Sequence, residues 1–327
     1  MGTPEFAATV LRQVLDAEMV DVVAVYTQPD RPCGRGKKCQ PGPVKLLALE
    51  RGLPVHQPET FKDPAEVATL AAYAPDVLLV AAYGMILPQP VLDIPRLMPL
   101  NVHASLLPAW RGAAPIERAI AAGDTLTGVT IMRMEAALDT GPMVLQRVLA
   151  IGDHDTAGSL RQELADLGGR LLVHALKRLS QGSVPLVPQD QDRATYAKKI
   201  DKAEAFIDWT RPAQEVHNLI RAMTPHPGAF FYWRPGADKP ALRIIAQPGE
   251  IGCPRPDDVQ PGQILGLTDG KLGIACADAV YLIPTVTPAG KRAMEATAFA
   301  CGYLGKCNDD AASAVCTPDE ALAPGRH

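Results

Sequence analysis

The sequence predicts an α/β protein in which a doubly wound, mostly parallel sheet is followed by a small C-terminal β-barrel. In the first half, runs that are apolar along their whole length alternate with helix-like segments, which is typical of parallel strands covered by helices on both faces. In the second half, short strand-like runs rich in proline and glycine follow one another closely, as in small barrels. With 327 residues, 47% of them hydrophobic, the chain is long enough for two domains.

The elements of the first half follow one another in strand–helix order. We predict strands at residues 20–27, 53–55, 76–83, 100–104, 128–134 and 143–151. We predict helices at residues 44–51, 64–74, 115–122 and 156–179. The last helix is long and amphipathic, can be capped by Thr156, and should therefore pack against the sheet.

A change in composition after Gly182 marks the end of the first domain, because the chain becomes polar there. We therefore place the first domain at residues 1–189, a charged linker at 190–209 and the barrel at 210–305. Residues 306–327 are polar enough to form a disordered tail.

Charge and cysteine content argue against several classes of protein. The net charge of −4 excludes wholesale electrostatic binding of nucleic acid, so any RNA contact must come from a local patch. Seven cysteines without a Cys-x-x-Cys pair argue against a zinc site or a disulfide framework, and we expect no metal. Because no run of 18 apolar residues and no signal-peptide pattern is present, we expect a cytoplasmic protein.

One exposed, glycine-rich loop carries a local basic patch. It lies between Asp30 and Lys45, and its cationic side chains are those of Arg31, Arg35, Lys37 and Lys38. A charge run of this kind is more often a solvated loop than a binding site. It can nevertheless track the phosphates of an RNA, so both interpretations stay open at this point.

Polar side chains follow the strand predicted at residues 100–104. Alternation along the strand puts Asn101 and His103 on one face, and α/β folds bind ligands at the carboxyl ends of their strands. Asp139 also follows a predicted strand. Each of these side chains alone could have its hydrogen bonds satisfied in the core or at a turn, but the three together indicate a functional site. An amide and an imidazole can stabilise an oxyanion, and a carboxylate can accept a proton.

The motifs around these residues resemble the folate-dependent formyltransferases. They are Asn101-Val102-His103, Ser105-Leu106-Leu107-Pro108, residues 111–116 (RGAAPI) and Leu138-Asp139-Thr140-Gly141. Further motifs resemble the members of this family that act on a charged tRNA: residues 2–7 (GTPEFA), 28–31 (QPDR), 34–38 (GRGKK), 221–225 (RAMTP), 227–229 (PGA) and 288–291 (PAGK). The resemblance covers the chain to about Leu304. It implies a Rossmann-like formyltransferase domain, a linker, and a C-terminal OB-like barrel that binds tRNA.

The resemblance also implies a reaction: transfer of a formyl group from 10-formyltetrahydrofolate to the amino group of methionyl-initiator tRNA, for translation initiation. Asn101 and His103 would stabilise the oxyanion and Asp139 would assist proton transfer, with no metal required. Two segments would form an apolar slot for the pterin ring. They are Ser105, Leu106, Leu107 and Pro108, and Met85, Ile86 and Leu87. The basic loop would contact tRNA phosphates through Arg31, Arg35, Lys37 and Lys38, and the family implies a monomer.

Three other interpretations use the same residues. A folate-dependent formyltransferase could act on a small amine, such as a glycinamide ribonucleotide or an amino-sugar nucleotide. A formyl-folate hydrolase would also share the three polar residues. A catalytically silent tRNA-binding protein would use only the basic loop and the barrel. The basic loop and the barrel argue against a small substrate, and the intact Asn101, His103 and Asp139 argue against a silent protein.

The family begins with an apolar strand that leads into the Gly2-Thr3-Pro4 turn, and here Met1 stands where that strand should end. The first strand of a doubly wound sheet is central, so its loss leaves two strand ladders unpaired. We therefore expect a gap in the sheet between the strands near Val22 and Leu100. We also hypothesise that the native protein starts several codons upstream and that Met1 is an internal methionine.

Overall fold

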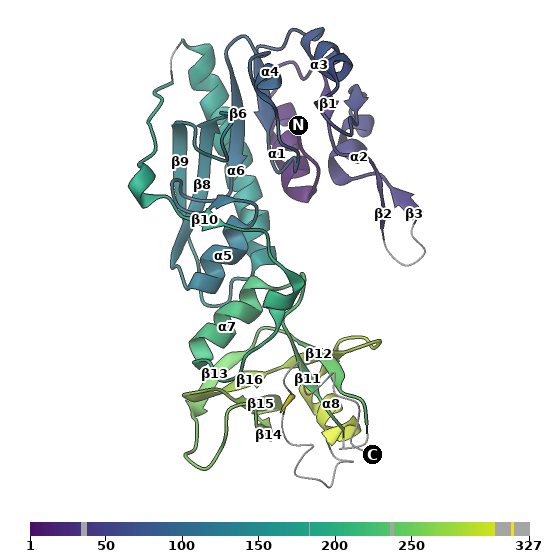
Figure 1. Ribbon diagram of the computed structural model, residues 1–327, viewed down its shortest axis with the longest axis vertical. Helices are drawn as coiled ribbons and strands as arrows, with labels where there is room; N and C mark the ends of the chain where they lie inside the picture. The colour runs from purple at the N-terminus through teal and green to yellow at the C-terminus, as the bar shows by residue number, and fades with distance from the viewer. Residues whose placement is uncertain (34–37, 183, 236–238, 305–314, 317–327) are drawn as a thin grey trace. The chain divides into compact units, whose positions relative to one another are not determined.

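The computed structural model describes residues 1–33, 38–182, 184–235, 239–304 and 315–316, which form two compact units (Figure 1). The N-terminal unit comprises residues 1–116, 126–151 and 159–199. The C-terminal unit comprises residues 117–125, 152–158 and the chain from residue 200 onward. Within the described ranges, every helix is too short or too polar to cross a membrane.

The N-terminal unit contains a parallel pair of strands beside a mixed four-stranded sheet, whereas the sequence predicted one mostly parallel sheet. The strands of the pair and of the four-stranded sheet are β1 (Val25–Tyr26), β4 (Val55–His56), β5 (Val77–Val80), β6 (Met98–His103), β8 (Leu126–Arg133) and β9 (Met143–Ala150). β1 pairs with β4 and β5 with β6 in parallel, but the pairs β6–β8 and β8–β9 are antiparallel. A short connection at residues 134–142 forces the opposite direction on β8 and β9.

Helices cover both faces of this sheet, as a doubly wound fold requires (Figure 1). They are α1 (Glu5–Asp16), α2 (Pro43–Glu50), α3 (Pro64–Ala71), α4 (Gln89–Leu92) and α6 (Ala157–Ser180). On one face α1 and α6 lie together, since Gln13 of α1 donates a hydrogen bond of 3.2 Å to the backbone oxygen of Asp166. On the other face, Leu70 of α3 and Val91 of α4 share a core with Leu78 of β5. The predicted helices lie close to their expected bounds, but α1 and α4 were not predicted.

The predicted gap in the sheet is present, although not at the predicted place. Met1 and Gly2 bridge Tyr26 and Ala81, since the Gly2 amide donates to the Tyr26 oxygen (3.0 Å) and the Ala81 amide donates to the Met1 oxygen (3.0 Å). Beyond them, a cavity of about 600 Å³ separates residues 19–26 from residues 73–81 and reaches the apolar side of α6. The gap therefore lies between β1 and β5, and not next to the strand of Leu100, because β5 pairs with that strand. Of the predicted strand at residues 20–27, only β1 forms a ladder.

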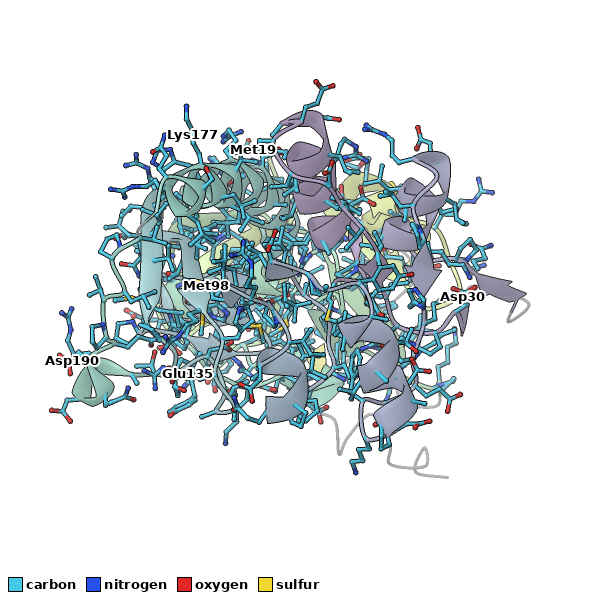
Figure 2. All side chains as sticks on the ribbon, turned by 90° about the horizontal axis from the view of Figure 1, so that it is seen from above. Met19, Asp30, Met98, Glu135, Lys177 and Asp190 are labelled. Carbon is cyan, nitrogen blue, oxygen red and sulfur yellow. The ribbon has the colours of Figure 1, made fainter. Side chains whose placement is uncertain are left out.

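The described part of the basic loop is a hairpin stem, in which β2 (Arg31–Cys33) pairs antiparallel with β3 (Lys38–Gln40). Lys45 anchors its base, because Lys45 Nζ lies 2.6 Å from Asp30 Oδ2 and 2.7 Å from Gln57 Oε1. Figure 2 shows Asp30 beside this hairpin.

The C-terminal unit contains two antiparallel sheets around one core, and no closed barrel is formed by its described strands. The five-stranded sheet holds β11 (Phe230–Trp233), β12 (Leu242–Ala246), β17 (Thr285–Pro288), β18 (Met294–Glu295) and β19 (Val315–Cys316). The four-stranded sheet holds β13 (Glu250–Pro254), β14 (Ile264–Thr268), β15 (Lys271–Ala275) and β16 (Ala279–Ile283). Large side chains fill the space between the sheets, among them Phe231, Trp233 and Phe299.

Three parts of this unit differ from the sequence prediction. Helices α7 (Ala213–Ala222) and α8 (Ala296–Gly302) were not predicted, and α5 (Pro115–Ala122) lies mostly in this unit. Val315 and Cys316, expected in a disordered tail, form β19 because the edge of β11 offers them a strand partner. The rest of the predicted tail at residues 306–327 lies outside the described residues.

Candidate active site

Two of the predicted catalytic residues lie on the last half of β6. Asn101 and His103 are 9% and 5% exposed. Asn101 pairs with Val80 of β5 and Met132 of β8, and His103 pairs with Thr130 of β8. Within the described part of the chain, no hydrogen bond engages the side-chain amide of Asn101. A buried strand thus presents an amide whose N–H groups are free for a ligand.

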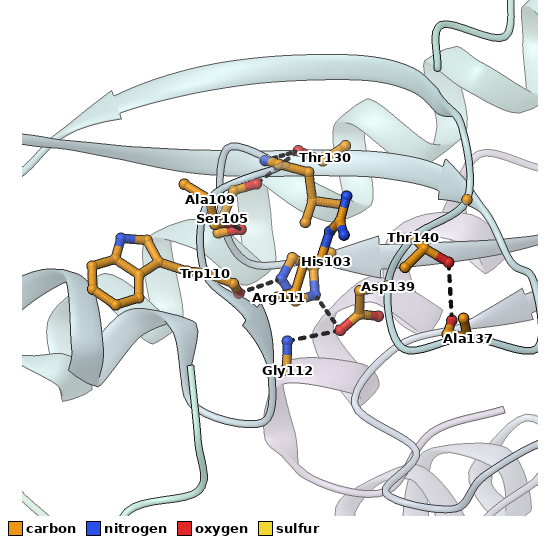
Figure 3. A network of polar contacts seen from close by, with 12 residues as sticks. His103, Ser105, Ala109, Trp110, Arg111, Gly112, Thr130, Ala137, Asp139 and Thr140 are labelled. Carbon is orange, nitrogen blue, oxygen red and sulfur yellow. Dashed lines mark hydrogen bonds and ion pairs between the residues drawn. The ribbon is translucent and has the colours of Figure 1, made fainter. Parts of the chain in front are cut away.

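The imidazole of His103 lies between a backbone carbonyl and a carboxylate (Figure 3). Its Nε2 is 3.0 Å from the backbone oxygen of Trp110, and its Nδ1 is 3.7 Å from Asp139 Oδ2. A carbonyl oxygen can only accept a hydrogen bond, so Nε2 carries a proton and donates it. The Nδ1 edge is left to face the carboxylate of Asp139.

Asp139 lies in the loop between β8 and β9, in a left-handed backbone conformation with φ of 51°. Its Oδ2 accepts a hydrogen bond of 2.9 Å from the Gly112 amide, and its other carboxylate oxygen has no partner among the described residues. Gly141 lies so close to the backbone oxygen of Arg133 that a Cβ at this position would overlap it. The Leu138-Asp139-Thr140-Gly141 motif therefore fixes a carboxylate beside His103.

The Ser105-to-Pro108 segment that follows β6 is a turn held by one hydrogen bond of its own and by side chains of β8 and β9. Ser105 Oγ donates to the Ala109 oxygen (2.6 Å), and Thr130 Oγ1 donates to the Ser105 oxygen (2.7 Å). Gln146 Nε2 donates to the Leu107 oxygen (2.8 Å). Ser105 and Leu107 are buried, whereas Leu106 and Pro108 are half-buried. Within this segment, Leu106 and Pro108 therefore offer the accessible apolar surface.

The second segment predicted to form the pterin slot, Met85 to Leu87, also contains both accessible and buried side chains. Met85 is half-buried and lines a cavity of about 390 Å³ together with Gln28, Arg31 and Glu59. Ile86 is 88% exposed, while Leu87 is 5% exposed and belongs to the core around Val91. The pterin slot stays a prediction, with Met85 and Ile86 as its accessible side chains here.

The predicted RNA-contacting residues are described only in part. Arg31 is exposed at the start of β2, and Lys38 begins β3. Arg35 and Lys37 lie outside the described residues. Lys45 at the far end of the loop is engaged, and its hydrogen bond lowers the pKa of Asp30 below the usual value, with a smaller contribution from Gln57.

Sequence reasoning missed two residues that hold this site together. Arg111 is 1% exposed and donates to the side-chain oxygen of Gln189, which is 6% exposed. Gln189 in turn contacts the loop of Asp139. Arg111 stands in a recognised motif, so a signal was present, but Gln189 falls at the polar end of the predicted first domain, where no pattern singles it out.

The described residues contain no group of three or more His, Cys, Asp or Glu side chains placed to hold a metal ion. The polar groups brought together are an unengaged amide, an imidazole and a carboxylate. They can donate to a developing oxyanion and accept a proton.

The family matches place this fold and this site among the formyl transferases. Residues 1–176 match the formyl transferase family, residues 199–304 match the formyl transferase C-terminal domain, and the chain belongs to this family. The relatives include methionyl-tRNA formyltransferases. That of Nitratidesulfovibrio vulgaris is 51% identical over 97% of this chain and 96% of its own length. That of Chromohalobacter salexigens is 52% identical over 89% of each chain. In fold, the chain is similar to an N-formyltransferase from Helicobacter canadensis, which was solved with folinic acid and dTDP-3-aminofucose. The TM-score is 0.60 and the sequence identity is 16%. The likeness covers 86% of this chain and 96% of that one.

Proposed function

We propose that this chain transfers a formyl group from 10-formyltetrahydrofolate to the free amino group of methionyl-initiator tRNA, for translation initiation. The single observation that carries the proposal is the name of its relatives: methionyl-tRNA formyltransferases about half identical to this chain along most of its length. The site geometry is consistent with that chemistry, because it combines hydrogen-bond donors with a carboxylate in a largely buried position.

The α-amino group of methionine attacks the formyl carbon of the folate, and a tetrahedral intermediate with an oxyanion forms. The unengaged amide of Asn101 donates a hydrogen bond to this oxyanion. His103 donates from Nδ1 in its protonated form, because Nε2–H is already engaged by the Trp110 oxygen. Both donors come from β6, so their spacing is set by a strand rather than by a mobile loop.

Proton transfer completes the reaction. The attacking nitrogen becomes an ammonium in the intermediate and must lose one proton. Asp139 accepts it on the carboxylate oxygen that Gly112 does not occupy. The carbon–N10 bond then breaks, N10 of the folate takes the proton, and the products are formyl-methionyl-tRNA and tetrahydrofolate. An α-amino group titrates near pH 8, so the attacking amine needs little activation.

The tRNA is held by two parts of the chain in this proposal. The basic hairpin, with Arg31, Arg35, Lys37 and Lys38, contacts backbone phosphates. The C-terminal unit, as an OB-like domain, contacts the rest of the tRNA, which a small amine substrate would not require. We further propose that the chain works as a monomer in the cytoplasm, where charged tRNA is available.

An assay with the purified chain tests the proposal. The chain is incubated with 10-formyltetrahydrofolate and, in parallel, methionyl-initiator tRNA, methionyl-elongator tRNA, glycinamide ribonucleotide or an amino-sugar nucleotide. We expect formyl-methionine on the initiator tRNA, together with one tetrahydrofolate per formyl group. Formylation of a small amine without turnover of the charged tRNA would contradict the proposal, as would release of free formate alone.

A further inference from the structure

We propose that Gln189 is a positioning residue for Asp139 and that Arg111 fixes the orientation of its amide. The inference rests on the proposed function, in which Asp139 accepts a proton. It concerns a residue on a separate segment, which contacts the backbone of the Asp139 loop and not its carboxylate.

One amide nitrogen of Gln189 holds both sides of the turn that carries Asp139. Gln189 Nε2 donates to the backbone oxygen of Asp139 at 2.8 Å and to that of Gly141 at 2.7 Å. These two bonds use both N–H groups of the amide. They clamp a turn whose left-handed residue, Asp139, is costly for a side chain to adopt without outside support.

Arg111 determines which end of the amide faces that turn. Its Nε and Nη2 both donate to Gln189 Oε1, at 3.0 Å and 2.7 Å. A guanidinium has no acceptor, so the atom that it contacts must be the amide oxygen. The NH₂ end then points at the two carbonyl groups, and a flipped amide would leave all four bonds unmade.

The guanidinium of Arg111 is nearly inaccessible, yet it forms no salt bridge in the described part of the chain. Its third contact is Nη1 donating to Gln191 Oε1 at 2.8 Å, so its neighbours are neutral amides. A buried cation held by neutral acceptors is expensive when stability is the only purpose. Its placement next to Gly112, which binds the Asp139 carboxylate, ties it to the site.

The segment of Gln189 is itself fixed to the sheet. Val187 and Met143 exchange backbone hydrogen bonds of 2.9 Å and 2.8 Å, which places Gln189 beside the start of β9. Hydrogen bonds thus connect β9, through the segment of Gln189, to the turn of Asp139. The carboxylate of Asp139 lies 3.7 Å from His103 Nδ1. A shift of the turn by a fraction of an ångström would change the distance between these two groups.

The test compares Gln189→Glu with Gln191→Ala. Gln189→Glu keeps an oxygen for Arg111 but removes both N–H donors to the Asp139 turn. Gln191→Ala removes a partner of Arg111 without touching that turn. We expect Gln189→Glu to lower kcat by about tenfold to a hundredfold, the scale expected of a misplaced catalytic group, with KM for both substrates changed by less than about twofold. Gln191→Ala should keep kcat close to that of the unchanged chain.

A double-mutant cycle separates positioning from general structural support. In the background of Asp139→Asn, the change Gln189→Glu should lower kcat no further, because its effect passes through Asp139. If Gln189→Glu does not fold, Gln189→Asn withdraws the same amide from the turn by one methylene and replaces it in the cycle. An unchanged kcat in a folded variant overturns the inference, and so does an undiminished loss in the Asp139→Asn background. Absence of formyl transfer by the unchanged chain would instead overturn the proposed function.

Discussion

At the scale of single residues, the site leaves one group free on each of its three polar side chains. The Asn101 amide has no described partner, His103 keeps its Nδ1 edge, and Asp139 keeps one carboxylate oxygen. Asn101, His103 and Asp139 hold no side-chain atom that is both sealed from solvent and without a partner, so their free groups are open to a ligand. This accessibility favours direct roles in the reaction over roles in the core.

The first prediction concerns these residues. Asn101→Ala, His103→Ala and Asp139→Ala should each lower the single-turnover rate of formyl transfer by on the order of a hundredfold or more, because each removes a group that serves the transition state. Filter binding should show nearly unchanged affinity for tRNA. Glu135→Ala is the matched control, since Glu135 lies in the same loop but is exposed and paired with Arg133. Near-normal rates for all three variants would refute the assignment.

A second prediction concerns the amino group of Met1. Burial lowers the pKa of this group from 8.0 to about 5 in the folded chain, where it donates to the Leu79 oxygen. Between these values the unfolded chain binds a proton that the folded chain does not. The free energy of unfolding should therefore decrease as the pH falls from about 8 to about 5. Urea unfolding of the chain and of its N-terminally acetylated form at pH 8, 6.5 and 5 tests this. Equal pH dependence of the two forms would contradict it.

The placement of the candidate catalytic residues could be predicted, because it follows from short-range rules. Alternation along β6 puts Asn101 and His103 on one face, and the loop after β8 brings Asp139 near His103. Gln189 could not be predicted, because the bonds that define its role join it to residues about fifty or more positions away. Neither periodicity nor turn chemistry encodes such a pairing.

At the scale of elements, the sequence predicted most strands and helices of the N-terminal unit but not the direction of every strand. Apolar periodicity located β8 and β9, yet periodicity carries no information on direction, and the alternation of strands and helices favoured a parallel sheet. Helix α1 was not predicted, although its buried residues Phe6, Val10 and Val14 recur at the spacing of one helix face. In the C-terminal unit, closely spaced short strands predicted a barrel, and only the pairing shows two sheets.

The basic hairpin supports the third prediction. Neutralising its four cations, Arg31, Arg35, Lys37 and Lys38, should weaken tRNA binding and lower the slope of log K against log salt by roughly one unit, or slightly less, for each phosphate that the hairpin no longer binds. The affinity for formyl-folate should not change. The matched control neutralises four cations of α1 and α6, namely Arg12, Arg170, Lys177 and Arg178, which are exposed. If both variants have the same salt slope, the hairpin is only a solvated loop.

At the scale of the whole molecule, the sheet is interrupted between β1 and β5. Met1 and Gly2 join the two halves at one end, and the cavity of about 600 Å³ runs along the rest of the interface. Val20 and Val23, which line it, are 36% and 45% exposed, an unusual state for residues in the middle of a doubly wound sheet. Their apolar surface, and the backbone of residues 20–24 outside any ladder, are suited to an extended, apolar strand.

The last prediction uses this cavity. An engineered chain with about six apolar, β-branched residues added before Met1 should place them as a strand between β1 and β5, in parallel with both. Each kcal/mol added to the free energy of unfolding raises the melting temperature of a domain of this size by roughly 2–4 °C. A gain of about 3 to 5 kcal/mol from the buried strand would therefore raise it by on the order of 10 °C. A chain extended by the same number of glycine and serine residues is the control, because it also removes the buried amino group but offers no apolar surface. Calorimetry measures the melting temperatures of the three chains. If the apolar extension melts no higher than the glycine–serine extension, the cavity does not accept a strand between β1 and β5.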